Sequence, residues 1–276
     1  MDHELAPYSD FEKLRFDRPA PWVLRVTIDN AEKMNAIGNQ LASELETIWS
    51  VIDSDPATRA AIITGAGRAF SSGGSFEAMP TERQRDHLDQ FCYDFGNTRA
   101  LIEAMITMRK PLISAINGPA VGAGLAIALL ADIPIAAKTA KLFDGHLRIG
   151  VVPGDHAAMI WPILCGLAKS KYHLLTNEPV TGEQAAAMNL IALAVESDEL
   201  QDKAVEVAVK LAATAPKALM MTKYLLNHFL RQNQTIFDLS AAFEMINFGS
   251  NEANEAMRAL KENKTPNFPP SIGVFR

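Results

Sequence analysis

A glycine-rich turn between an apolar strand and a fully apolar helix is the feature that most constrains the fold of this chain. The strand is predicted at Pro111–Ile116, the turn at Gly118–Gly124 and the helix across Leu125–Leu130. The first turn of a helix carries backbone N–H groups without intrahelical partners and the positive end of the helix dipole. Because glycine lets a ligand approach the backbone closely, the turn indicates a site for an anion or a developing oxyanion. The alternative is that the glycines serve only tight packing of the helix on the strand.

A second strand leads into a turn of the same kind. The segment Ala61–Thr64 is typical of a buried strand, and Gly65–Gly67 and Arg68–Phe76 follow it. A carbonyl oxygen that gains charge during a reaction is stabilised by two N–H donors, and each of the two turns can supply one. The pair of turns therefore favours an enzyme that acts on a carbonyl compound.

The pattern of the whole chain predicts an α/β protein with a helical end. With 276 residues, of which 48% are hydrophobic and 21% charged, the chain can bury a large core. Strands are predicted at Val23–Ile28, Ala60–Thr64, Pro111–Ile116, Ile133–Ala137 and Leu193–Val195, and one helix face is predicted from Leu41, Leu45, Ile48, Trp49 and Ile52. Their alternation favours parallel βαβ units with right-handed crossovers. From Leu200 onward the pattern is helical only, with breaks at Pro216 and Gln232–Gln234.

Charge and cysteine content exclude several classes of protein. A formal charge of −6 argues against a nucleic-acid surface, and no apolar run is long enough to span a bilayer. The cysteines, Cys92 and Cys165, lie in apolar contexts without metal-ligand spacing, which is typical of a reducing compartment. We therefore expect a cytoplasmic protein that binds neither nucleic acid nor membrane and has no metal site and no cofactor.

The two turns and the segments around them resemble the crotonase (enoyl-CoA hydratase/isomerase) superfamily. The matching segments, in order between about Trp22 and Ala194, are Gly67–Gly74, Lys110–Gly124, Ala131–Ile133 and Gly150–Gly154. The resemblance implies a crotonase-like spiral of βαβ units over residues 1–200. It also implies a C-terminal helical region, residues 201–276, that packs against neighbouring subunits in a homotrimer or a hexamer built as a dimer of trimers. The alternative for these helices is a self-contained lid.

The same resemblance assigns a site and exposes a departure from the family pattern. By resemblance, the oxyanion hole consists of the backbone N–H groups of Gly74 and Ala123. Hydratases of the superfamily usually carry two glutamates, but this chain has Ala126 at the first position and His146 at the second. Addition of water to an enoyl thioester needs a base and an acid, and alanine can be neither. The sequence therefore argues against ordinary hydratase activity.

A histidine and an aspartate replace the glutamate pair. Asp155 follows His146 by nine residues, across the turn that ends in Pro153–Gly154. An aspartate that accepts a hydrogen bond from one imidazole nitrogen makes the other nitrogen more basic, which suits activation of water. The alternatives are that Asp155 only caps the helix predicted near His156, that His146 is a structural histidine, or that His156 is the base.

This arrangement resembles a narrower branch, the oxocamphor-type β-diketone hydrolases. That branch uses a His–Asp dyad and a glutamate from the C-terminal helices, and the resemblance places Glu244 in that role. The branch has a histidine in the oxyanion turn where this chain has Ala123, so two substrate types remain, a free diketone and a thioester. Trp161 and Phe76 are expected to line the substrate pocket, with a core position as the alternative for Trp161.

Three functional interpretations follow from the sequence. The first is hydrolysis of a C–C bond in a β-diketone by a retro-Claisen reaction, in which His146, oriented by Asp155, activates water. The second is enoyl-CoA hydratase or isomerase chemistry on an acyl-CoA substrate. The third is a homologue that has lost catalysis. The absence of both glutamates favours the first and third, and the His–Asp pair favours the first.

Overall fold

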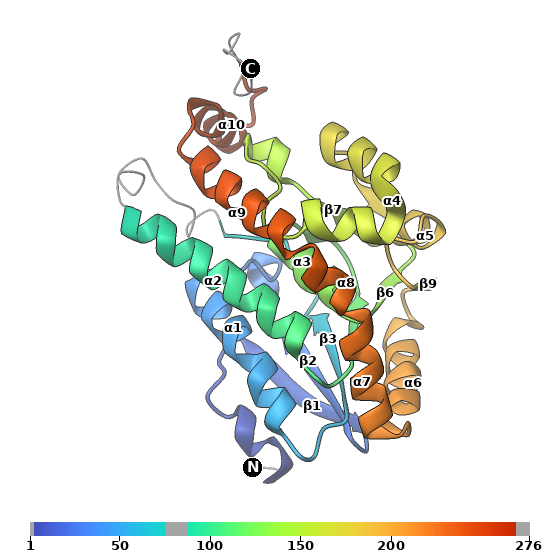
Figure 1. The fold of residues 1–276 in the computed structure, drawn as a ribbon. Coiled ribbons are helices and arrows are strands. Elements are labelled where there is room, and N and C mark those ends of the chain that lie inside the picture. The colour runs from blue at the N-terminus through green and yellow to red at the C-terminus, as the bar shows by residue number, and fades with distance from the viewer. Residues whose placement is uncertain (1–2, 76–87, 269–276) are drawn as a thin grey trace.

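A six-stranded sheet forms the centre of the computed structural model, which describes residues 3–75 and 88–268 (Figure 1). Only the backbone is described for residues 3–4 and 88–94. In spatial order the strands are β1 (Leu14–Ala20), β2 (Val23–Ile28), β3 (Ala60–Gly65), β4 (Leu112–Ile116), β6 (Ile133–Ala137) and β9 (Leu193–Val195). β1 is antiparallel to β2, and the other neighbours are parallel. Parallel pairing of β3 with β4 brings their carboxyl ends to one edge, so the turns that follow them start side by side.

A small second sheet continues the glycine-rich turn. It contains β5 (Ala120–Val121), β7 (Lys141–Phe143) and β8 (Val180–Thr181), with β7 in the middle. The short 3₁₀ helices are η1 (His3–Tyr8), η2 (Ala31–Lys33) and η4 (His146–Ile149). The α-helices are α1 (Asn39–Ser54), α2 (Leu88–Thr107), α3 (Ala123–Leu130), α4 (Ala157–Thr176), α5 (Gly182–Ala187), α6 (Leu200–Ala212), α7 (Pro216–Leu226), α8 (His228–Gln232), α9 (Gln234–Phe248) and α10 (Asn251–Lys261).

The α/β fold predicted from the sequence is confirmed. Strands β2, β6 and β9 have the predicted bounds, and β3 and β4 differ from them by one residue. All five apolar residues expected on one helix face are buried on α1. The helical end also follows the prediction, because α7 begins at Pro216 and the junction of α8 and α9 lies at Asn233. The sequence did not indicate β1 or the second sheet, whose strands β5, β7 and β8 have only two or three residues each.

The packing of the helices positions the site. α6 lies on β2, β3, β4 and β6, while α3 packs against β4 and α2. α9 runs beside α2 and contacts α4 (Figure 1). The main core extends from Tyr8 to Ala241, and a separate cluster of Ile149, Val151, Ala253 and Met257 joins η4 to α10. This second cluster holds the chain just before the turn that leads to α4.

No helix in the described ranges is long and apolar enough to cross a membrane. The proposed division of the chain at residue 200 stays a prediction.

Candidate active site

The two glycine-containing turns meet beside the start of α3. The N–H of Val121 donates to the carbonyl of Ser71 at 3.0 Å and so joins the turns. α3 begins at Ala123, and its N-cap Gly122, with φ 47° and ψ −123°, makes no side-chain capping bond. Within the described part of the chain, the N–H groups of Gly74 and Ala123 take part in no backbone hydrogen bond. The oxyanion role expected for these two N–H groups stays a prediction.

The ring of His146 lies against this helix start. Gly145 separates Asp144 from His146, and its left-handed φ of 87° turns the chain sharply. As a result, Nδ1 of His146 lies 3.1 Å from Oδ1 and 3.2 Å from Oδ2 of Asp144. A Cβ atom on Gly122 would lie 3.7 Å from Cε1 of His146. The imidazole is thus adjacent to the residue that precedes the Ala123 N–H.

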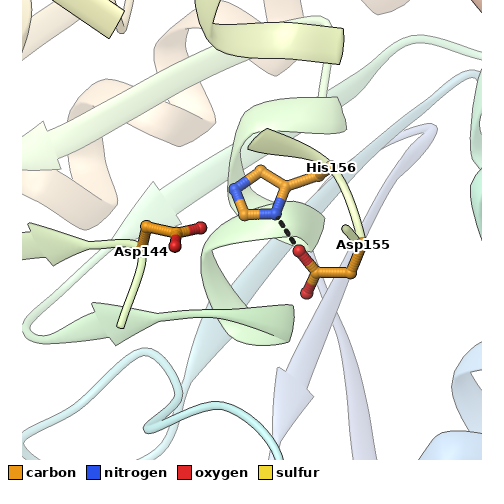
Figure 2. Close-up of side chains that lie close together, drawn as sticks. All are labelled: Asp144, Asp155 and His156. Atoms are coloured by element: carbon orange, nitrogen blue, oxygen red, sulfur yellow. Dashed lines mark hydrogen bonds and ion pairs between the residues drawn. The ribbon is translucent and has the colours of Figure 1, made fainter. Parts of the chain in front are cut away.

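The expected pairing of His146 with Asp155 has a different form in the structure. Oδ2 of Asp155 lies 3.8 Å from Nε2 of His146, whereas Oδ1 of Asp155 lies 2.5 Å from Nδ1 of His156. Figure 2 shows this bond, with Asp144 on the other side of the His156 ring. The N-cap of α4 is His156, without a side-chain capping bond, so Asp155 is not a helix cap.

Asp144 is the site residue that the sequence reasoning missed. Its carboxylate lies at one imidazole nitrogen of His146, Nδ1, and so has the position relative to the ring that was expected for Asp155. The usable signal was the spacing of an aspartate and a histidine around one glycine, because a glycine can turn the two side chains toward each other.

Glu244 reaches the site from α9, about 90 residues further along the chain. Its Oε1 lies 3.4 Å from Nε2 of His146, and its side chain is only 5% exposed. The turn before α4 packs closely against α9, where the hydroxyl of Ser240 donates a hydrogen bond to the carbonyl of Gly154 at 2.9 Å. A Cβ atom on Gly154 would lie 2.5 Å from Cβ of Glu244. Glycine at this position is therefore what allows Glu244 to approach His146.

Burial and neighbouring charges shift the pKa values of these groups. Burial lowers the pKa of His146, but the carboxylates of Asp155 and Asp144 outweigh burial and hold it well above its ordinary value. Burial raises the pKa of Glu244, and the contact with His146 offsets this only in part. For Asp155, the charges of His156 and His146 outweigh burial and hold the pKa at about 2. These directions favour the protonated form of the His146 ring and make the Glu244 carboxylate a stronger base than an ordinary glutamate.

One group of side chains in the described residues has the composition of a metal site. Ligand atoms of Asp144, Asp155 and His156 lie within 4.8 Å of one another (Figure 2). Nε2 of His156 is buried and has no hydrogen-bond partner within the described structure. Asp144 is already in contact with Nδ1 of His146, so a metal ion here would compete with His146 for that carboxylate. The expectation that the protein has no metal site stays a prediction.

The structure describes only one of the two residues that were expected in the substrate pocket. Trp161 on α4 is 1% exposed and belongs to the main core, as its alternative interpretation held. Phe76 lies outside the described residues. Ala126 lies buried on α3, and its side chain has no group that can transfer a proton.

Comparison with known proteins identifies the family. The family model for enoyl-CoA hydratase/isomerase matches residues 21–270. The chain belongs to this family. A probable enoyl-CoA hydratase of Bacillus subtilis (strain 168) is 30% identical over 253 residues, which are 90% of this chain and 95% of that protein. The (E)-benzylidenesuccinyl-CoA hydratase of Thauera aromatica is 32% identical over 202 residues, 73% of this chain and 77% of that protein.

Solved structures agree with the sequence relatives. The crystal structure of an enoyl-CoA hydratase/isomerase from Mycobacterium paratuberculosis superposes with a TM-score of 0.83 at 27% identity, and the match covers 90% of this chain and 99% of that one. These names contradict our expectation of a β-diketone hydrolase. The narrower oxocamphor-type resemblance, which rested on His146, Asp155 and Glu244, is not supported. The acyl-CoA interpretation fits the family better.

Proposed function

We propose that this protein hydrates the double bond of an enoyl-CoA thioester, with His146 and Glu244 as the acid–base pair. The observation that supports this most directly is the 3.4 Å separation of His146 Nε2 and Glu244 Oε1 beside the start of α3. Hydration needs one group that takes a proton from water and another that gives a proton to the α-carbon. The two buried side chains supply both groups without the missing glutamates.

The oxyanion site prepares the substrate. In the proposed complex, the thioester carbonyl oxygen accepts hydrogen bonds from the N–H groups of Gly74 and Ala123. These donors draw electron density from the conjugated double bond and stabilise the enolate that forms when water adds. The positive end of α3 favours the same negative charge.

The pKa directions support one division of roles within the pair. Glu244, as the carboxylate, takes a proton from water while the water oxygen bonds to the β-carbon. His146, as the imidazolium, then gives its Nε2 proton to the α-carbon of the enolate. The site is left with a protonated Glu244 and a neutral His146, and one proton transfer between them restores the starting state. Asp144 accepts a hydrogen bond from the Nδ1–H group throughout and keeps the ring in place.

Purified protein offered crotonyl-CoA should form 3-hydroxybutyryl-CoA, measured as loss of the enoyl absorbance and by mass spectrometry. Glu244→Gln and His146→Gln should each lower kcat on the order of 10²–10⁴-fold, as expected for loss of an acid–base group. Glu206→Gln, on the exposed surface of α6, is the matched control and should leave kcat unchanged. If wild-type protein forms no hydroxyacyl product, hydration is the wrong assignment.

We also propose that the chain forms the homotrimer or the dimer of trimers implied by its sequence resemblance. Large apolar side chains on the C-terminal helices support self-association: Leu225 is 67%, Phe229 61% and Ile246 65% exposed in the single chain. Light scattering should give three or six times the chain mass of 30.1 kDa. A monomeric mass would rule the assembly out.

A further inference from the structure

We propose that Asn35 and Ser71 are positioning residues that hold the two oxyanion N–H groups at a fixed spacing. This inference rests on the proposed function, because it concerns how the thioester carbonyl is polarised. Neither residue belongs to the acid–base pair. Their role follows from a chain of hydrogen bonds that begins in the loop before α1 and ends at the start of α3.

Asn35 braces the turn that follows β3. The residue is fully buried and has a left-handed φ of 57°. Its Nδ2 donates to the carbonyls of Ala66 and Ala69, at 2.9 and 2.8 Å, and its Oδ1 accepts the N–H of Asn30 at 2.9 Å. Three bonds from one buried amide connect two loops that are about 30 residues apart in sequence. Buried amides of this kind specify a single local geometry.

Ser71 links Asn35 by hydrogen bonds to both oxyanion turns. Its hydroxyl donates to the backbone carbonyl of Asn35 at 2.8 Å and accepts the N–H of Gly73 at 3.2 Å. Gly73 directly precedes Gly74, the first proposed donor. The backbone carbonyl of Ser71 accepts the N–H of Val121, two residues before Ala123, the second proposed donor.

Close packing makes this connection stiff. A Cβ atom on Gly124 would lie 2.5 Å from Cβ and 2.6 Å from Oγ of Ser71, so the first turn of α3 rests directly on this serine. A displacement of Ser71 therefore moves the Gly74 and Ala123 N–H groups relative to each other. Oxyanion stabilisation depends on donors placed before the reaction begins, so a small loss of alignment reduces the rate.

Ser71→Ala is the main test, because it removes the hydroxyl and keeps Cβ. Ser114→Ala is its matched control: Ser114 is also fully buried, and its hydroxyl donates to the carbonyl of Ala128 at 2.7 Å, at the far end of α3. Asn35→Ala is a second variant that disturbs the same turn from the other side. Thermal melts of all variants report folding.

The primary readout is the ¹³C chemical shift of the carbonyl of [1-¹³C]butyryl-CoA, a saturated thioester that cannot be hydrated. Wild-type protein and Ser114→Ala should move this signal downfield by the same amount, whereas Ser71→Ala and Asn35→Ala should show a smaller shift. The kcat for crotonyl-CoA should fall on the order of 10²-fold in Ser71→Ala. Affinity for S-butyl-CoA, a thioether without a carbonyl oxygen, should stay the same.

The outcomes separate this inference from the proposed function. A Ser71→Ala variant with the wild-type ¹³C shift and the kcat of Ser114→Ala overturns the positioning role alone. Equal losses of thioether and thioester affinity in Ser71→Ala also overturn it, because they indicate a general packing defect. Wild-type protein that neither binds nor polarises the thioester overturns both proposals.

Discussion

Gly154→Ala tests whether the docking of α9 determines the catalytic geometry. The φ of Gly154 lies outside the left-handed region, so alanine can adopt this backbone and the effect is steric. The new Cβ would lie 2.5 Å from Cβ of Glu244 and 2.5 Å from the carbonyl oxygen of Ser240. Ordinary contacts between such atoms are about 3.5 Å, so α9 and the turn must separate by about 1 Å. Glu244 then moves away from His146.

The size of the effect follows from that displacement. A shift of about 1 Å in a catalytic group costs on the order of 10²-fold in rate. Overpacking costs about 1–3 kcal/mol, and each kcal/mol lowers Tm by about 2–4 °C in a protein of this size class. The assay is kcat for crotonyl-CoA hydration at saturating substrate, together with a thermal melt. Gly96→Ala on α2 is the control, since its Cβ would meet open space. If Gly154→Ala lowers Tm but keeps kcat within about twofold of wild type, the packing of α9 does not determine the position of Glu244 in catalysis.

Three further predictions concern charge. The kcat should follow a bell-shaped pH profile, because Glu244 gains a proton at low pH and His146, whose pKa is raised, loses one at high pH. A profile without an alkaline limb would contradict the role of His146 as the acid. Asp144→Asn should move that alkaline limb to lower pH, because it removes a carboxylate that raises the pKa of His146, and an unmoved limb would exclude the role of Asp144. Asp55→Ala should lower the free energy of unfolding by about 3 kcal/mol in urea titrations, because it removes the buried carboxylate that lies 2.7 Å from the partly buried guanidinium of Arg18. The pKa of Asp55 is held at about 2 in the folded state, so the contribution of Asp55 to the free energy of unfolding should be present above the ordinary pKa of an aspartate and disappear as the pH falls toward 2. Equal urea midpoints for variant and wild type at neutral pH would contradict this.

Local pattern in the sequence was sufficient to predict most of the fold. The apolar run of β2 and the spacing of buried residues on α1 are local patterns, and each can be recognised within the residues of that one element. Pro216 marked the start of α7 because proline is favoured in the first helical turn. The strands of the second sheet were missed because two or three residues contain no measurable period, and their pairing partners lie more than 20 residues away.

By itself, the sequence determined the two glycine-containing turns and the absence of an acid at Ala126, since both are matters of residue type at a given position. Only the tertiary structure decided which groups lie together. Asp144, not Asp155, lies at Nδ1 of His146, because the left-handed Gly145 folds two near neighbours onto each other. Glu244 reaches the same ring only because α9 packs against a turn about 90 residues earlier. Distances of this kind depend on how whole elements pack, and no short segment of sequence contains that information.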